Sequence, residues 1–273
     1  MFCSLDLPKP FCTFALFTLV SLGLGSSLNA GLITDWKEFL GTIPTSGMDT
    51  ANPVFGDGTE SSAESATIAG QFRTVNLGIG DTITYSGSTI LTGGSDHDGG
   101  QYRFGIFNDG GQFAADSGNF WTGGWMHIVS GRDGGGDPNF GGLYRGRTNG
   151  GFLSGGGDAA DVGATRVTSG TLEGDSTNPF VWSMLLTRSS ATTIDIFSSI
   201  AGGDGNFSET MSINGVTTSN FTFTAGGWLF GGISELDQGS FSNVSFSAVP
   251  EPSSALLFGL ASVGFFRRRR SSN

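Results

Sequence analysis

Short stretches in which apolar and polar residues alternate recur along this chain from residue 66 to residue 248. Thr67 to Leu77 and Gln101 to Phe107 show the pattern plainly, and Val181 to Leu186 and Phe241 to Phe246 repeat it. A period of two residues is typical of a β-strand with one buried and one exposed face. About a dozen such stretches follow one another, separated mostly by Gly, Asn, Asp and Ser. Because no amphipathic helical pattern interrupts them, the sequence predicts an all-β sandwich or barrel.

The predicted strands are 67–77, 82–85, 89–91, 101–107, 125–129, 142–147, 164–169, 181–186, 193–197, 209–213, 221–224, 228–232 and 241–246. The segment before them alternates less clearly. Trp36, Phe39 and Leu40 favour a short helix, and the Ser-, Gly- and Thr-rich residues that follow predict a loosely ordered lead-in or a first strand pair.

The first thirty residues have the outline of a secretory signal peptide. Phe14 to Leu24 is apolar, Lys9 precedes it, and Leu28-Asn29-Ala30 closes it with a small residue. Both cysteines, Cys3 and Cys12, lie within this leader. The predicted mature body is therefore exported without a disulfide, and core burial must supply its stability.

The last 25 residues, 249–273, contain three elements in order. Pro250-Glu251-Pro252 interrupts regular structure, because proline lacks a backbone donor and biases the residue before it towards extended geometry. The apolar run Ala255 to Phe266 follows. The third element is the basic cluster Arg267, Arg268, Arg269 and Arg270. An apolar run with a basic end is typical of a short membrane helix whose charged end stays in the cytoplasm.

These three elements in this order resemble the C-terminal sorting signal of PEP-CTERM proteins, exported proteins that a membrane transpeptidase called exosortase processes. The resemblance implies that exosortase is a partner, that the chain is cut at or near Pro250 to Pro252, and that the arginine tail is lost. A plain membrane anchor is the alternative. Twelve helical residues span only about 18 Å, whereas a hydrocarbon core is about 30 Å thick, which favours transient anchoring. The expected location is the cell envelope or the extracellular space.

The predicted organisation is a signal peptide at 1–30, a lead-in at 31–65, a β-sandwich at 66–248 and a sorting signal at 249–273. Between the two signals lie 218 residues, enough for one domain with a core of its own. This body contains 8 basic and 22 acidic residues and carries a formal charge of −14. Such a balance disfavours nucleic acid and anionic membranes, which require clustered Lys and Arg, and suits calcium or neutral sugars.

Three parts of the body resemble the concanavalin A-like jelly roll of the lectin and laminin-G superfamily. They are residues 101–107, the pair 180–186 and 192–197, and the closing stretch 239–247. The resemblance implies a two-sheet antiparallel jelly-roll sandwich, and a lectin-like domain that binds polysaccharide or helps to build an extracellular matrix. It transfers no active site.

Glu235-Leu236-Asp237 is the first candidate for chemistry. Jelly-roll glucanases that retain configuration use a Glu-x-Asp-x-x-Glu strand, in which two carboxylates flank the scissile bond about 5 Å apart. Here the third position is Ser240, so the acid/base partner is missing. We therefore predict a non-enzymatic protein with ordinary solvated acids in this loop. The alternative is a secreted carbohydrate-active hydrolase or lyase on the same fold, with acids that folding brings together.

Asp96-His97-Asp98-Gly99 is the second candidate. Oxygen ligands at alternate positions of a glycine-rich loop suit calcium, which makes Asp96 and Asp98 candidate ligands. No glutamate follows at the distance that a full calcium loop requires, and this favours a polar surface turn. His97 and His127 are the only histidines, and the predicted mature chain has no cysteine, so the sequence argues against a zinc site.

Phe120-Trp121-Thr122-Gly123-Gly124-Trp125 is the third candidate. Trp121 and Trp125 stand four residues apart around a glycine pair and could form a platform on which a sugar ring stacks. Packing in the core is the alternative and is favoured, because aromatic side chains lie more often in cores than in sites.

Overall fold

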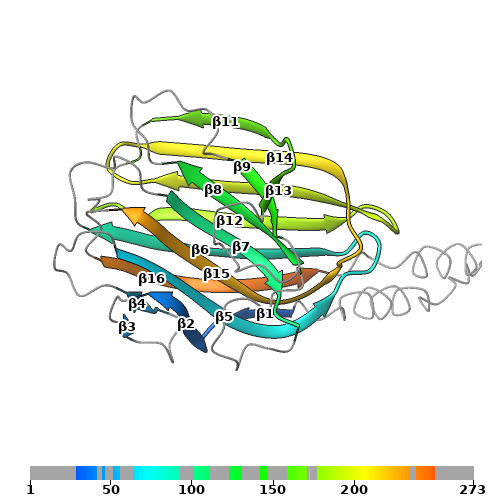
Figure 1. Ribbon diagram of the computed structural model, residues 1–273, viewed down its shortest axis with the longest axis horizontal. Helices are drawn as coiled ribbons and strands as arrows, with labels where there is room; N and C mark the ends of the chain where they lie inside the picture. Colours follow the sequence, from blue (N-terminus) through cyan, green and yellow to red (C-terminus); the bar gives the residue numbers. More distant parts are fainter. Residues whose placement is uncertain are drawn as a thin grey trace, which may run out of the picture. The chain divides into compact units, whose positions relative to one another are not determined.

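The computed structural model describes residues 29–41, 45–46, 52–55, 64–92, 101–110, 123–130, 142–146, 159–170, 172, 177–233 and 238–249. These residues belong to one compact unit, Asn29–Glu251. Every pairing between the described strands is antiparallel. The strands form two sheets that overlap as layers (Figure 1).

Sheet A has nine strands. In spatial order eight of them are β11 (Thr165–Ser169), β14 (Phe207–Thr217), β13 (Thr193–Gly202), β12 (Phe180–Arg188), β6 (Thr82–Thr92), β16 (Gln238–Val249), β4 (Val54–Phe55) and β3 (Thr45–Ser46). The ninth strand, β1 (Asn29–Leu32), also pairs with β16.

Sheet B has seven strands. In spatial order they are β10 (Ala159–Asp161), β9 (Gly142–Gly146), β8 (Gly123–Ser130), β7 (Gln101–Asn108), β15 (Thr222–Ile233), β5 (Glu64–Asn76) and β2 (Trp36–Gly41). The chain passes repeatedly from one sheet to the other, for example from β4 through β5 and β6 to β7. The predicted fold class, a two-sheet antiparallel jelly-roll sandwich, is confirmed.

Aromatic rings from both sheets meet in the core. Trp182 of sheet A lies with its ring centroid 5.0 Å from that of Trp228 and 5.4 Å from that of Phe104, both of sheet B. All three side chains are fully buried. Aromatic pairs at these separations contribute about 0.5–1.5 kcal/mol each beyond the area that they bury. The rings therefore hold the two layers together where no disulfide is present.

Two strands are longer than the sequence pattern predicted. The prediction broke β6 around Gly87 and β15 around Gly226, but each runs through without interruption. A Cβ at Gly87 would lie 2.7 Å from the Trp182 ring, and one at Gly226 would lie 2.6 Å from the Tyr85 ring. These glycines are therefore places where a core aromatic ring packs against the backbone, and they are not turns.

The beginning of the described chain differs from the expected short helix. Trp36 starts the strand β2, which pairs with β5 in sheet B, and the Trp36 side chain is buried. β1 pairs with β16 in sheet A, where Asn29 is opposite Ala248. Residues before position 66 therefore contribute strands to both sheets. None of the described residues forms a helix that is long and apolar enough to cross a membrane, and the predicted helix at 255–266 lies outside them.

Candidate functional site

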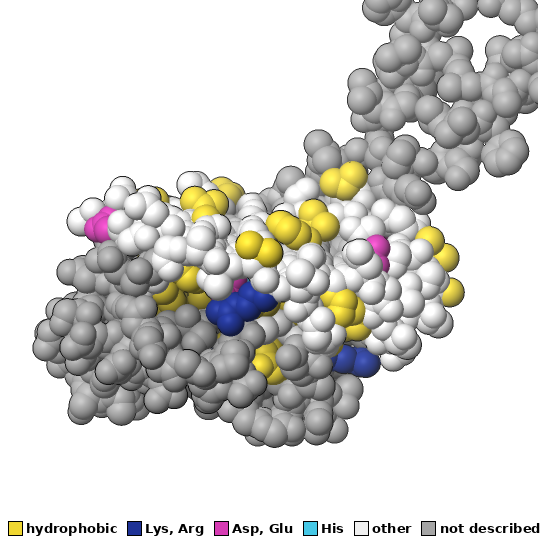
Figure 2. All heavy atoms as spheres, turned by 90° about the horizontal axis from the view of Figure 1, so that it is seen from above, with side chains coloured by type: hydrophobic (Ala, Val, Ile, Leu, Met, Phe, Trp, Pro, Cys, Tyr) yellow, Lys and Arg dark blue, Asp and Glu magenta, His cyan; other side chains and the backbone are white. Residues whose placement is uncertain are grey.

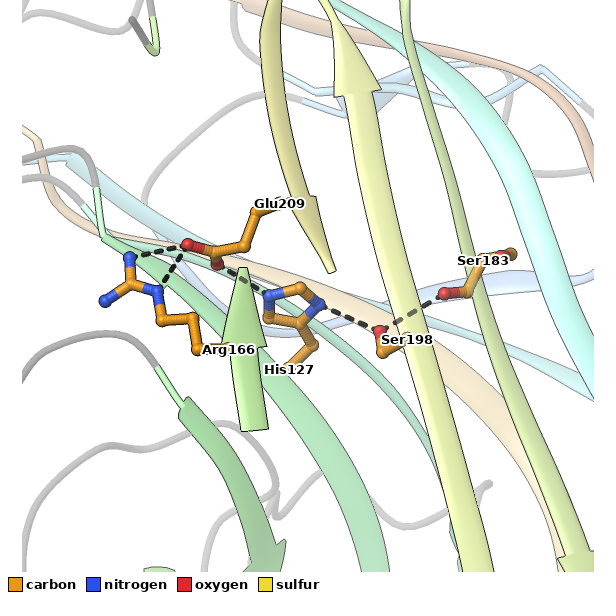
Figure 3. Close-up of polar contacts among 5 residues, drawn as sticks. All are labelled: His127, Arg166, Ser183, Ser198 and Glu209. Carbon is orange, nitrogen blue, oxygen red and sulfur yellow. Dashed lines mark hydrogen bonds and ion pairs between the residues drawn. The ribbon is translucent and has the colours of Figure 1, made fainter. Parts of the chain in front are cut away.

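A cluster of polar side chains is buried between the two sheets (Figure 3). His127, on β8 of sheet B, reaches across to two residues of sheet A: its Nδ1 lies 2.8 Å from Ser198 Oγ and its Nε2 lies 2.8 Å from Glu209 Oε1. Arg166, on β11, donates from Nε to Glu209 Oε2 at 2.7 Å. His127, Ser198 and Glu209 are completely buried. We call these four residues the buried cluster.

The polar groups of the buried cluster form a chain of hydrogen bonds. Burial lowers the pKa of His127 below its ordinary value, against the opposing effect of the hydrogen bond to Glu209. The imidazole is therefore neutral near pH 7. Its Nε2–H donates to the carboxylate of Glu209, whose charge Arg166 balances, and its Nδ1 lies 2.8 Å from the Ser198 hydroxyl, which also donates to the carbonyl oxygen of Ser183. The polar side-chain groups of Ser198, His127 and Glu209 thus all have partners.

Serine, histidine and glutamate in hydrogen-bonded order also occur in hydrolytic triads, so this arrangement must be distinguished from one. In such triads Nε2 faces the serine and Nδ1 faces the acid, whereas here the two nitrogens are exchanged. Ser198 Oγ also lies 3.1 Å from the carbonyl oxygen of Ser183, which competes for its proton. No solvent reaches Ser198, His127 or Glu209. In the described part of the structure, the buried cluster therefore links the two sheets through enclosed side chains.

Sequence reasoning missed the buried cluster, although a local signal was present. His127 stands between Trp125 and Val129 in a strand whose alternate residues are apolar, and both neighbours lie in the core. Glu209 stands in the same way between Phe207 and Met211. An ionisable residue at an inward position of a strand requires a buried partner. Because His127 and Glu209 both occupy such positions, a contact between them was predictable from the sequence.

Of the two tryptophans proposed for sugar stacking, only Trp125 is among the described residues. Its side chain is 2% exposed and belongs to the core. The structure thus gives Trp125 the packing role, because no ring face is left for a sugar. Trp121 lies outside the described residues.

The other predicted site residues also lie outside the described residues. This applies to Asp96 and Asp98, to Glu235 and Asp237, and to the sorting residues Pro250, Glu251, Pro252, Arg267, Arg268, Arg269 and Arg270. Within the described part of the chain, no group of three or more His, Cys, Asp or Glu side chains could hold a metal ion.

The last strand, β16, ends at Val249, immediately before Pro250. A groove of about 230 Å³ lies at this end of the sandwich. Its lining includes Ala248 and Val249 of β16, Arg73 of β5, and Asp81. The folded body therefore extends up to the first residue of the Pro-Glu-Pro triplet.

Residues 248–270 match the PEP-CTERM protein-sorting motif. No curated protein matches the chain in sequence.

Among solved structures, the carbohydrate recognition domain of Emp47p is similar with a TM-score of 0.48 and 11% identity, over 83% of this chain and 98% of that chain. The VIP36 exoplasmic/lumenal domain, in a Ca2+/Man3GlcNAc-bound form, has a TM-score of 0.44 and 12% identity, over 81% and 88%. Lectin II from Ulex europaeus has a TM-score of 0.42 and 9% identity, over 82% and 98%. The described part of the chain is an antiparallel jelly-roll sandwich, and residues 248–270 match the PEP-CTERM protein-sorting motif.

Proposed function

We propose that this chain is an exported protein of the cell envelope or extracellular matrix that exosortase processes at or near Pro250 to Pro252. The match of residues 248–270 to the PEP-CTERM protein-sorting motif is the observation that carries the proposal. The apolar leader at 1–30 and the confinement of both cysteines to it also support export. The run Ala255 to Phe266 then acts as a transient membrane helix, held by its arginine end until the chain is cut.

Replacement of the Pro-Glu-Pro triplet by alanines, in a host that has exosortase, tests this proposal. The variant carries Pro250→Ala, Glu251→Ala and Pro252→Ala, and the control carries Ser253→Ala and Ser254→Ala. We expect the control to reach the envelope without Arg267 to Arg270, and the triplet variant to keep these arginines and stay in the membrane fraction. A triplet variant that is processed as efficiently as the control would contradict the proposal.

We further propose that the body binds neutral polysaccharide and does not cleave it. The formal charge of −14 between the two signals disfavours polyanionic ligands. On the face that Figure 2 shows, the described charged side chains form only small, separate patches among neutral ones. The carboxylate of the buried cluster, Glu209, is enclosed and held by Arg166 and His127, so it is not accessible to a ligand.

Retention of the purified full chain on cellulose, xylan and mannan tests the second proposal, with reducing ends measured in the same samples. Alginate serves as the acidic control, and each sample is run with calcium and with a chelator. We expect retention on at least one neutral polysaccharide without released ends. Loss of retention on chelation would assign a calcium role to Asp96 and Asp98. Release of ends would replace the binding role with a hydrolase or lyase.

A further inference from the structure

We propose that the outer face of sheet A is the surface that binds the neutral polysaccharide. This inference rests on the proposed function and names the surface that performs it. The surface consists of residues that alternate with core residues on the same strands. In β12, for example, Trp182 and Met184 are fully buried, and Ser183 between them points to the opposite side of the sheet. The same alternation holds in β13, where Ser199 stands between the buried Ser198 and Ile200.

Cross-strand register aligns the outward residues of six neighbouring strands in three rows, which we call the hydroxyl face. The middle row is Val167, Thr210, Ser199, Ser183, Ser86 and Ser245. One flanking row is Thr165, Ser212, Phe197, Leu185, Thr84 and Ser247. The other is Ser169, Ser208, Ala201, Val181, Ser88 and Ser242. With strands about 4.8 Å apart and alternate residues about 6.8 Å apart, the face measures about 24 by 14 Å.

The chemistry of the hydroxyl face matches that of a neutral sugar polymer. None of its residues is charged, and all are Ser or Thr except five, which are Val167, Phe197, Leu185, Ala201 and Val181. Three of the apolar side chains are exposed, Val167 by 64%, Val181 by 60% and Phe197 by 43%. A polysaccharide presents hydroxyl groups at the edges of its rings and C–H groups on their faces. The Ser and Thr hydroxyls of the hydroxyl face can therefore bond to sugar hydroxyls, and its apolar side chains can pack against the C–H faces of the rings.

The hydroxyl groups of this face retain hydrogen-bonding capacity. The Oγ atoms of Ser183 and Ser199 lie 3.0 Å apart, and those of Ser88 and Ser242 lie 3.2 Å apart. Each hydroxyl supplies one donor and two acceptor sites, so one bond within a pair leaves an O–H and several lone pairs for another molecule. Because hydroxyl hydrogens rotate, a pair can offer either a donor or an acceptor to a sugar hydroxyl.

Other classes of partner fit this surface less well. Protein interfaces are enriched in Tyr, Trp, Met and Arg and depleted in Ser, and the hydroxyl face contains none of the four. A second copy of this chain is therefore a poor occupant. Nucleic acid and anionic membranes require Lys or Arg, which the face also lacks.

A lysine in the middle row tests the assignment. Ser199→Lys places a long charged side chain at the centre of the hydroxyl face, and Ser199→Ala removes only the hydroxyl. The matched control is Ser219→Lys, because Ser219 is an exposed serine in the turn between β14 and β15. All variants are made in the full chain, checked for folding by circular dichroism and applied to cellulose, xylan and mannan.

We expect Ser199→Lys to weaken retention about tenfold or more, Ser199→Ala to weaken it about two- to tenfold, and Ser219→Lys to leave it unchanged. If the unchanged chain is retained and folded Ser199→Lys is retained equally well, the hydroxyl face is overturned as the site while polysaccharide binding stands. If the unchanged chain is retained on none of the polysaccharides, both proposals fail. Self-association of the unchanged chain that Ser199→Lys abolishes would assign the face to a second copy.

Discussion

The buried cluster and the hydroxyl face are both polar, and they meet in strand β13. Ser198 belongs to the buried cluster, and the next residue, Ser199, belongs to the hydroxyl face. Ser198 points inward, where His127 and Ser183 surround its hydroxyl, whereas Ser199 points outward and shares a bond only with Ser183. In the buried cluster the polar groups of Ser198, His127 and Glu209 are bonded to other groups of the protein. On the hydroxyl face donors and acceptors remain unused. Polar residues of the first kind hold the sheets together, and those of the second kind are available to a ligand.

The largest effect should come from breaking the ion pair of the buried cluster. Glu209→Ala leaves His127 buried without its acceptor and Arg166 without its counter-ion, so we expect the free energy of unfolding to fall by about 3–5 kcal/mol. Thr210→Ala, the next residue on the same strand, lies on the hydroxyl face and should change it by no more than about 0.5 kcal/mol. Denaturant unfolding of both variants measures this. Equal losses would remove the distinction between the two regions.

The adjacent serines of β13 give a smaller and closer contrast. Ser198→Ala leaves Nδ1 of His127 and the carbonyl oxygen of Ser183 without the hydroxyl that both contact, and we expect a loss of about 1–3 kcal/mol in the free energy of unfolding. Ser199→Ala removes a hydroxyl that water can replace, and the loss should not exceed about 0.5 kcal/mol. The same denaturant titration compares the two. A Ser199→Ala variant that loses as much as Ser198→Ala would show that the outward hydroxyls stabilise the fold and are not held in reserve.

The pH dependence of stability should follow His127. Burial lowers its pKa in the folded state below the ordinary value of about 6.5, so the unfolded chain binds the proton more readily. At pH values above about 6.5, the neutral imidazole makes its whole contribution to stability. This contribution is lost as the pH falls below about 6.5 towards the folded pKa.

Unfolding free energies measured between pH 7.5 and pH 5 check this pH dependence. We expect them to fall with pH in the unchanged chain and in His97→Gln, which alters the other histidine of the sequence. The slope should disappear in His127→Gln. A slope that survives in His127→Gln and vanishes in His97→Gln would place the titrating group elsewhere.

Much of the sandwich was predictable, because alternation is a local property. Residues of β12 such as Trp182 and Ser183 show in the sequence which side of the strand is buried. The two missed continuations, at Gly87 and Gly226, depend on contacts with Trp182 and Tyr85 that only the packed core creates. From the sequence alone, a glycine that forms a turn cannot be told from a glycine against which an aromatic ring packs.

The buried cluster and the hydroxyl face were not predicted, since both depend on long-range pairing. His127 meets Ser198 and Glu209 at sequence separations of 71 and 82 residues. The hydroxyl face requires β12 to lie beside β6, which places Ser183 opposite Ser86. The sequence showed which residues point outward, but not which strands are neighbours.

Hydroxyl-radical footprinting of the full chain tests the central claim most directly. The chain is exposed to hydroxyl radicals in the presence of the neutral polysaccharide that retains it. A second sample contains alginate at the same concentration, to correct for radical scavenging by sugar. The account predicts that bound polysaccharide lowers labelling of Phe197, Leu185 and Val181 on the hydroxyl face, while labelling of Trp121 stays constant. Protection of Trp121 with unchanged labelling of Phe197 would contradict it and move the binding site to the segment that contains Trp121.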